Sequence, residues 1–216
     1  MNTAILFDLD GTILNTDKLI KKTFIKVFEK YKPEYILSED ELLSFLGPSL
    51  KESFLKYFSS EKVDELIEYY HDYNHSHHKD FVYVYPSVIE TLEYLKNKDY
   101  PLAIVTTKLK IAADIGLNTF DLKKYFDVVI GYDDVRTTKP DPEGILKAMK
   151  LLKVEKAICV GDNITDIEAG KNAGVKTIAV KWSPKGFKKL QELNPDLLVD
   201  KMIEIIPYIE GVCEDD

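Results

Sequence analysis

Asp8-Leu9-Asp10-Gly11-Thr12 directly follows the apolar run Ala4–Phe7, and this junction decides the fold of the chain. A short apolar run that ends in polar residues is typical of a strand buried on both faces of a parallel sheet. Residues two apart in an extended chain point the same way, so Asp8 and Asp10 face one pocket, and Gly11 permits the sharp turn that follows. Two carboxylates so close are costly unless a cation lies between them or one is protonated. The pair therefore indicates a divalent metal or an acid/base pair, although taken alone it also fits an ordinary exit from a strand.

Three further polar segments also follow strand-like runs. They are Thr106-Thr107 after Leu102–Val105, Lys139-Pro140 in the loop beyond Val128–Ile130, and Gly161-Asp162 with Asp166 after Ala157–Val160. Ligands of an open parallel sheet bind in the crevice beyond the carboxyl ends of its strands. The four segments therefore bring four carboxylates, two hydroxyls and one ammonium to one edge of the sheet. This combination predicts a magnesium-dependent site for phosphoryl transfer.

Each of these residues also has a simpler explanation. Acids are common at helix starts, so Asp166 fits an N-terminal cap as well as a metal site, whereas Asp162 beside Gly161 at a strand end favours function. A loop lysine is usually solvated, but Lys139 faces a surplus of carboxylates and would balance the charge of a phosphoryl group. The hydroxyl and backbone N–H groups of Thr106-Thr107 suit phosphate oxygens, and threonine is also common at strand ends.

Strand-like and helical patterns alternate over most of the chain. The remaining strand-like runs are Thr177–Val180 and the shorter Leu197–Val199. Helical patterns lie between the strands at Ser87–Asn97, at Asp141–Leu152 and at Ile164–Ala173, which stops at Gly174. This alternation predicts an α/β fold with a doubly wound parallel sheet.

One inserted segment interrupts the alternation after the first strand. It shows no strand pattern, and its apolar residues recur at helical spacing in Thr16–Tyr31, Ser38–Phe45, Ser49–Phe58 and Glu61–Lys79. Both of its connections, near Asn15 and Phe81, return to the same sheet edge. We therefore expect a small α-helical cap domain, 15–81, inserted into a core domain formed by 1–14 and 82–216.

Length and composition exclude several classes of protein. A chain of 216 residues that is 45% hydrophobic can form one core and a small accessory domain. Its formal charge of −8 argues against a nucleic-acid partner. We expect no membrane partner, because no apolar run approaches the roughly eighteen residues of a span. We expect no secretory signal, because Asp8 and Asp10 follow the N-terminus almost at once, with no basic lead-in or long apolar stretch. Cys159 and Cys213 form no disulfide or zinc pattern, so the expected location is the cytoplasm. The oligomeric state stays open.

In this order, the four segments resemble the four motifs of the haloacid dehalogenase superfamily of phosphatases. The resemblance covers nearly the whole chain, and the DLDGT stretch at Asp8–Thr12 carries the most specific motif. It implies a Rossmann-like core and an enzyme. By this resemblance Asp8 is the nucleophile that forms an aspartyl-phosphate, and Asp10 protonates the leaving group and then activates water.

The same resemblance assigns the remaining ligands. It implies that the transferring phosphoryl group is held by Thr106, Thr107, Gly11 and Lys139, and that Lys139 also restrains the nucleophile. It implies a Mg²⁺ cofactor ligated by Asp8, the backbone carbonyl of Asp10 and Asp162, with Asp166 in support. The expected partner is a small phosphorylated substrate or pyrophosphate.

The inserted segment should set the choice of substrate, because the sheet edge meets only the phosphoryl group. The turn Gly47-Pro48-Ser49 either reaches into the cleft or simply joins two helices. All four histidines lie between positions 71 and 78. In this stretch, Asn74, His75 and His78 either meet a second anionic group of the substrate or belong to a solvated helix end, where histidine complements the dipole.

Further stretches resemble the PpaX-type inorganic pyrophosphatases of Gram-positive bacteria and, more loosely, the phosphoglycolate phosphatases. They are FLGPSL (45–50), YNHSHH (73–78), IVTTK (104–108), KPDPE (139–143), VGDN (160–163) and AGKNAG (169–174). This resemblance implies hydrolysis of pyrophosphate. The alternatives are a phosphomonoesterase acting on phosphoglycolate or another small metabolite, a sugar-phosphate mutase, and a phosphate-sensing protein without turnover. Lys108 and the stretch Tyr132-Asp133-Asp134 have no predicted role beyond turn formation.

Overall fold

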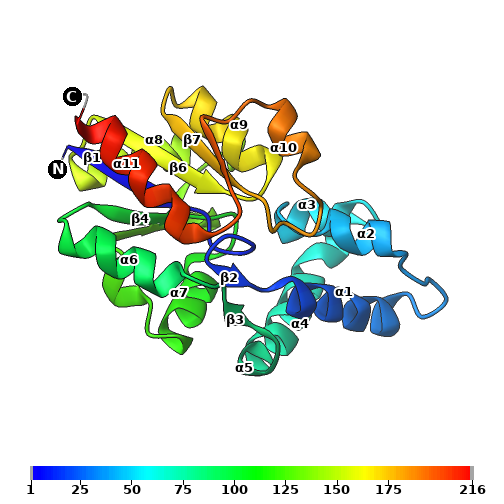
Figure 1. Ribbon diagram of the computed structural model, residues 1–216. Helices are drawn as coiled ribbons and strands as arrows, with labels where there is room; N and C mark the ends of the chain where they lie inside the picture. The colour runs from blue at the N-terminus through cyan, green and yellow to red at the C-terminus, as the bar shows by residue number, and fades with distance from the viewer. Residues whose placement is uncertain (1, 215–216) are drawn as a thin grey trace. The chain divides into compact units, whose positions relative to one another are not determined.

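The computed structural model describes residues 2–214, and six parallel strands form its central sheet (Figure 1). Their order across the sheet is β5-β4-β1-β6-β7-β8. The strands are β1 (Thr3–Phe7), β4 (Leu102–Val105), β5 (Val128–Ile130), β6 (Lys156–Gly161), β7 (Lys176–Val180) and β8 (Leu197–Val199). The α/β fold with a doubly wound parallel sheet, predicted from the alternation of patterns, is confirmed.

Strand β1 lies in the middle of the sheet, and all five of its residues are buried. Phe7 is paired with Ile104 of β4 on one side and with Val160 of β6 on the other. The carboxyl ends of these three strands are therefore level with one another. This register brings the residues that follow each strand to one stretch of the sheet edge.

Helices cover both faces of the sheet (Figure 1). Side chains alternate along β1, so Ala4 and Leu6 pack on one face with residues of α8 (Glu143–Leu152) and α9 (Ile164–Asn172). The other face is covered by α6 (Val88–Asn97), α7 (Lys110–Thr119) and α11 (Ile205–Glu214). Right-handed crossovers between parallel strands place the helices in these two layers.

Several element boundaries differ slightly from the predicted ones. Helix α8 begins at Glu143 instead of Asp141, whose carboxylate accepts a hydrogen bond from the Glu143 backbone N–H at 2.9 Å. Three helices lie outside the predicted elements, namely α7, α10 (Lys188–Glu192) and α11. Poor helix formers weaken the pattern in α7, at Gly116, and in α11, at Pro207 and Gly211, whereas the five residues of α10 are too few to show a period.

The chain divides into two compact units, a larger one of 2–14 with 84–214 and a smaller one of 15–83. The short strands β2 (Leu14–Asn15) and β3 (Tyr83–Val84) pair where the chain passes between them. Between Asn15 and Tyr83, the regular elements of the smaller unit are all helices. Its elements are α1 (Asp17–Tyr31), α2 (Glu39–Ser44), α3 (Leu50–Leu55), the 3-10 turn η1 (Ser60–Lys62), α4 (Val63–Ser76) and α5 (His78–Phe81).

The stretch Glu61–Lys79, whose apolar residues recur at helical spacing, is divided between two helices. Helix α4 ends at Ser76, and α5 begins at His78. The Ser76 hydroxyl lies 3.0 Å and His77 Nδ1 lies 2.9 Å from the Tyr73 carbonyl oxygen. Side chains that bond to the last carbonyls of a helix compete with the backbone of the next turn, and this competition explains the break.

Aromatic rings fill the core of the smaller unit. Phe24 is fully buried and stacks on Phe45 with ring centroids 3.9 Å apart. Phe54 and Tyr70 pack on the same ring at 5.2 and 5.1 Å. Phe24 therefore holds helices α1, α3 and α4 together.

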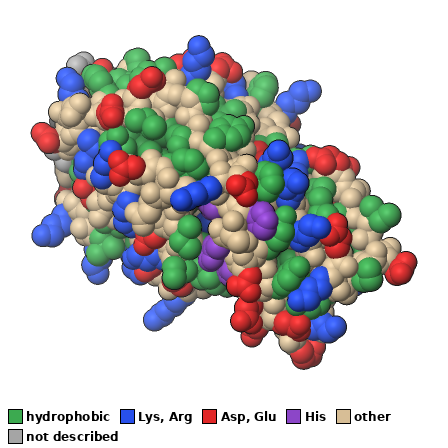
Figure 2. All heavy atoms as spheres, turned by 90° about the horizontal axis from the view of Figure 1, so that it is seen from below, with side chains coloured by type: hydrophobic (Ala, Val, Ile, Leu, Met, Phe, Trp, Pro, Cys, Tyr) green, Lys and Arg blue, Asp and Glu red, His purple; other side chains and the backbone are tan. Residues whose placement is uncertain are grey.

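None of the helices within residues 2–214 combines the length and the apolar character that a membrane crossing requires. Acidic and basic side chains are interspersed on the face shown in Figure 2, and several histidine side chains reach that surface. All four histidines of the chain belong to the stretch 71–78.

We expect Phe24→Ala to lower the free energy of unfolding by about 3–5 kcal/mol, because it leaves a cavity among packed rings. Urea denaturation followed by circular dichroism measures the change. Ile36→Ala is the matched control, since Ile36 is 90% exposed, and it should shift stability by less than about 0.5 kcal/mol. Equal effects of the two substitutions would contradict the assigned core.

Candidate functional site

Asp8 occupies the first position beyond β1, at the level of the neighbouring strand ends. Its backbone N–H donates to the Val160 carbonyl at 2.9 Å, which extends the sheet ladder to this residue. The side chain is only 8% exposed. A carboxylate in this position needs a counter-ion, because burying an unpaired charge is costly.

Lys139 supplies that counter-ion from the loop after β5. Its Nζ donates to Asp8 Oδ1 at 2.6 Å, to Asp166 Oδ1 at 2.5 Å and to the Val105 carbonyl at 3.0 Å. An ammonium group has three N–H donors, and these three acceptors satisfy all of them. The lysine side chain is 8% exposed, so it bridges two carboxylates inside the protein.

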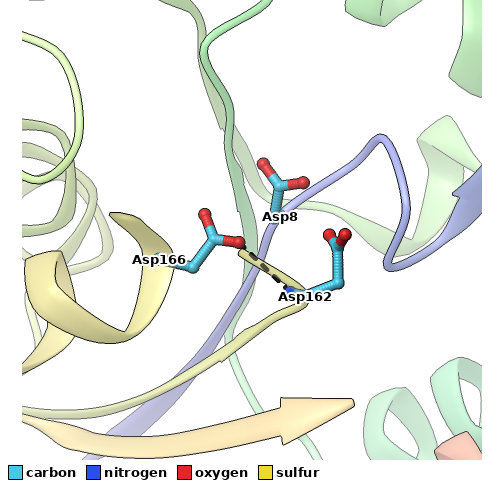
Figure 3. A group of neighbouring side chains, drawn as sticks. All are labelled: Asp8, Asp162 and Asp166. Atoms are coloured by element: carbon cyan, nitrogen blue, oxygen red, sulfur yellow. Dashed lines mark hydrogen bonds between the residues drawn. The ribbon is translucent and has the colours of Figure 1, made fainter. Parts of the chain in front are cut away.

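Asp162 and Asp166 complete a buried acidic group with Asp8 (Figure 3). Asp162 follows β6, and Asp166 lies in the first turn of α9. The second oxygen of Asp166 accepts from the backbone N–H groups of Asp162 at 3.2 Å and Asn163 at 2.9 Å. Asp166 therefore serves as a helix cap and as a partner of Lys139 at once. One carboxylate oxygen from each of the three acids lies within 4.8 Å of the others.

Two neutral groups hold the Asp162 carboxylate. The Thr12 hydroxyl donates to Oδ1 at 3.0 Å, and the Asn163 amide donates to Oδ2 at 3.2 Å. Gly11 makes room for it, because a Cβ at this position would lie 2.4 Å from Asp162 Oδ2. The Gly11 φ of +91° also lies in the left-handed region that favours glycine. Gly11 therefore contributes to the site by leaving room for the Asp162 carboxylate.

The loop after β7 carries two contacts that sequence reasoning missed. Trp182 Nε1 donates to the Gly11 carbonyl at 2.9 Å, and Lys185 Nζ donates to Asn163 Oδ1 at 2.9 Å. Asn163 in turn contacts Asp162, so this loop braces the segments on both sides of the acidic group. Isolated polar residues in a loop have no periodicity, and nothing in the sequence pattern could have identified them.

Burial and charge act in opposite directions on the central pair. Burial raises the pKa of Asp8 to about 7, even though the Lys139 ammonium opposes the rise. Burial would lower the pKa of Lys139, but the charges of Asp166 and Asp8 hold it above its usual range. Lys139 therefore stays an ammonium, while Asp8 needs more positive charge nearby to stay fully ionised at neutral pH.

A divalent cation would supply that charge. Asp8, Asp162 and Asp166 are buried and offer the oxygen ligands that hard cations prefer. Among them, the Lys139 ammonium contacts Asp8 and Asp166. Oxygen atoms from all three lie close enough to contact one ion. The residues present therefore fit a divalent metal.

Asp10 turns its carboxylate to a different partner. Lys108 Nζ donates to both of its oxygens, at 3.1 and 3.0 Å. Thr106, beyond β4, is buried, and its hydroxyl oxygen accepts from the Lys108 backbone N–H at 3.3 Å. Thr107 is half-buried beside it. The predicted residues of the larger unit thus share one edge of the sheet. Lys108 lies at the same edge, although no pattern in the sequence predicts it there.

The predicted residues of the smaller unit have local contacts of their own. The Ser49 hydroxyl caps α3 in a reciprocal pairing with Glu52, after Gly47 at φ +108° and Pro48. Asn74 is buried, and its amide lies 3.4 Å from the Thr23 hydroxyl. The rings of His75 and His71 stack at 5.3 Å, and His78 is the first residue of α5.

The chain resembles known proteins in both sequence and fold. The family described as "Haloacid dehalogenase-like hydrolase" matches residues 5–180. A protein of Bacillus cereus (strain Q1) named pyrophosphatase PpaX is 45% identical over 211 residues, which cover 97% of each chain. A crystal structure described as a predicted phosphatase from Clostridium acetobutylicum superposes with a TM-score of 0.85 at 27% identity, covering 98% of this chain and 99% of that one. One described as a predicted phosphoglycolate phosphatase from Haemophilus somnus has a TM-score of 0.85 at 21% identity over 95% and 97% of the two chains, and shows the same fold.

We expect Lys139→Met to destabilise the metal-free protein by about 3–5 kcal/mol at pH 7.5, because two buried carboxylates lose their counter-ion. Urea denaturation in the presence of a chelator measures the loss. It should shrink toward pH 5, because burial raises the pKa of Asp8 to about 7 and protonation of Asp8 then removes one of the buried charges. Lys150→Met, at an exposed position of α8, is the control. A loss below about 1 kcal/mol would contradict the bridging role of Lys139.

Proposed function

This chain belongs to the haloacid dehalogenase-like hydrolase family and is an enzyme, and we propose that it hydrolyses inorganic pyrophosphate to two phosphates. One observation carries the proposal: the buried carboxylate of Asp8 lies at the end of the central strand, 2.6 Å from the Lys139 ammonium and within a set of three acids. Pyrophosphate as the substrate is supported by the 45% identity, over nearly the whole chain, to a protein named as a pyrophosphatase.

The proposed cofactor is Mg²⁺. The residues that would hold it are Asp8, the backbone carbonyl of Asp10 and Asp162, with Asp166 in support. When bound, the ion would offset the negative charge of the substrate phosphate and of the attacking carboxylate. Lys139 contributes a fixed positive charge at the same place, since it is held by Asp8 and Asp166 before any substrate arrives.

In the first proposed step, a carboxylate oxygen of Asp8 attacks one phosphorus atom of pyrophosphate. The new oxygen–phosphorus bond forms as the bond to the bridging oxygen breaks, and the bridging oxygen leaves with the electron pair. Asp10 gives its proton to that oxygen, so that the first phosphate departs protonated. Lys139 and the donors of Thr106, Thr107 and Gly11 hold the oxygens of the transferring group.

The second proposed step restores the enzyme. A water molecule attacks the phosphorus of the aspartyl-phosphate, and Asp10, now a carboxylate, takes the proton from that water. The bond between phosphorus and the Asp8 oxygen breaks, which returns the carboxylate and releases the second phosphate. Dividing the hydrolysis in this way replaces one slow displacement by two easier ones.

We assign the choice among phosphate esters to the smaller unit, acting as a cap, through Gly47-Pro48-Ser49 and through Asn74, His75 and His78. Imidazole and amide groups are suitable donors for a second phosphate. Ser49 and Asn74 already have hydrogen-bonding partners inside the smaller unit, and these contacts explain why serine and asparagine occupy the two positions. His75 and His78 supply the imidazole groups of this assignment. A cytoplasmic location is supported by the free thiols of Cys159 and Cys213.

Asp8→Asn should abolish the release of phosphate from pyrophosphate, by about 10³-fold or more, because a carboxamide is a poor nucleophile. A colorimetric phosphate assay measures the rate, and circular dichroism confirms that the variant is folded. Asp40→Asn, an exposed carboxylate in the first turn of α2, is the control and should retain full activity. An Asp8→Asn enzyme with most of its activity would rule out this nucleophile, and a wild type inactive on pyrophosphate would rule out the substrate.

Mg²⁺ should raise the thermal midpoint of the wild-type protein measured in the absence of substrate, because an ion that binds only the folded state stabilises it. Differential scanning fluorimetry over a Mg²⁺ titration, starting from chelated protein, gives the shift. Asp162→Asn should need a Mg²⁺ concentration higher by roughly tenfold or more for the same shift, since it removes one charged ligand. A wild-type midpoint that does not respond to Mg²⁺ would contradict the metal site.

A further inference from the structure

Lys108 carries a second ammonium group at this sheet edge, and neither proposed step gives it a role. Its Nζ contacts both oxygens of Asp10, at 3.0 and 3.1 Å, a two-point ion pair. The side chains are partly shielded from water, with 14% of Lys108 and 21% of Asp10 exposed. Lysine side chains lose much conformational freedom when they are ordered, so this placement requires support from elsewhere.

A turn beyond β5 provides part of that support. The Tyr132 backbone N–H donates to the Lys108 carbonyl at 2.8 Å, and the Asp133 carboxylate accepts from the Lys110 backbone N–H at 2.8 Å. Gly131 lies so close to this segment that a Cβ would approach the Lys110 nitrogen to 2.5 Å. The backbone from the Lys108 carbonyl to Lys110 is therefore clamped. The stretch Tyr132-Asp133-Asp134, for which the sequence predicts only turn formation, thus helps to hold the Lys108 backbone in place.

The two lysines serve the two ends of the reacting bond. Lys139 touches Asp8, the proposed nucleophile, and Lys108 touches Asp10, the proposed proton donor. The oxygen that receives the proton from Asp10 must lie about 3 Å from one of its carboxylate oxygens. Since Lys108 Nζ lies 3.0 and 3.1 Å from those oxygens, the leaving group comes within about 6 Å of the ammonium.

We propose that Lys108 determines specificity for a leaving group that carries its own negative charge, by binding that anion beside Asp10. This inference rests on the proposed function and deepens it, because the leaving group of pyrophosphate is a phosphate. An ammonium next to a phosphate or carboxylate makes a charge-assisted hydrogen bond, which is about twice as strong as a neutral one. An uncharged alkyl leaving group makes no comparable interaction with the ammonium. In the resting enzyme the same ammonium is paired with the Asp10 carboxylate. The bound anion takes over this ammonium, and Asp10 then takes up from solvent the proton that it gives to the leaving oxygen.

Steady-state kinetics on three substrates test this role. They are pyrophosphate, phosphoglycolate, whose leaving group is a carboxylate-bearing alcohol, and ethyl phosphate, whose leaving alcohol needs the same proton from Asp10 but carries no anionic group. The variants are Lys108→Met and Lys108→Arg, with Lys150→Met on the exposed face of α8 as the control for lost charge. Circular dichroism and the thermal midpoint establish that each variant is folded.

We expect Lys108→Met to lower kcat/KM by roughly 30-fold or more for whichever of the two anionic substrates the wild type hydrolyses, and by less than about threefold for ethyl phosphate. Lys108→Arg should keep the preference for the anionic leaving group, and Lys150→Met should match the wild type on all three substrates. An equal loss on charged and uncharged leaving groups would overturn the inference and leave Lys108 as a positioning residue for Asp10 alone. Unchanged kinetics would overturn both roles.

The same measurements separate this inference from the proposed function. A wild type that is inactive on pyrophosphate but active on phosphoglycolate would refute pyrophosphate as the substrate. The inference about Lys108 would then still require that Lys108→Met lose more activity on phosphoglycolate than on the substrate with an uncharged leaving group. A wild type that prefers ethyl phosphate to both anionic substrates would refute the role of Lys108 directly.

Discussion

The arrangement of the site depends on one buried interaction, the contact of the Lys139 ammonium with the carboxylates of Asp8 and Asp166. Two negative charges and one positive charge are removed from water here, which costs more than a single hydrogen bond returns. The cost is offset because all three N–H donors of the ammonium have acceptors, and because backbone N–H groups bond to the other Asp166 oxygen. The result is a rigid group with an excess of negative charge, which is the electrostatic condition for binding a divalent cation.

Close packing protects this arrangement from relaxing. Gly161 faces Asp166 so closely that a Cβ there would lie 2.3 Å from the Asp166 Cβ, and Gly11 lies as tightly against Asp162. The loop after β7 braces the same segments through Trp182 and Lys185. Catalysis of phosphoryl transfer consists mainly of positioning and charge stabilisation, so such bracing bears directly on the proposed chemistry. In that chemistry, one lysine stands at the nucleophile and another at the leaving group.

Much of this protein could be predicted from its sequence. Buried parallel strands are short apolar runs, so Leu102–Val105, Val128–Ile130 and Leu197–Val199 are identified with the boundaries that the structure has. The polar residues that follow such runs lie at one edge because parallel strands share a direction. That rule places Asp8, Asp162 and Lys139 near one another before any coordinates are known. The roles of these residues in catalysis remain proposals.

The sequence by itself determined the sheet, its helical insertion and the chemical character of one edge, because these follow from local periodicity and from strand direction. Only the tertiary structure decided which charges pair. Lys108 and Asp10 are separated by 98 residues, and Lys139 and Asp8 by 131, so no local pattern links them. The break at His77 and the contacts of Trp182 were likewise decided by the folded chain. Hydrogen bonds and ion pairs depend on positions within a few tenths of an ångström, which arise only when separate elements pack together.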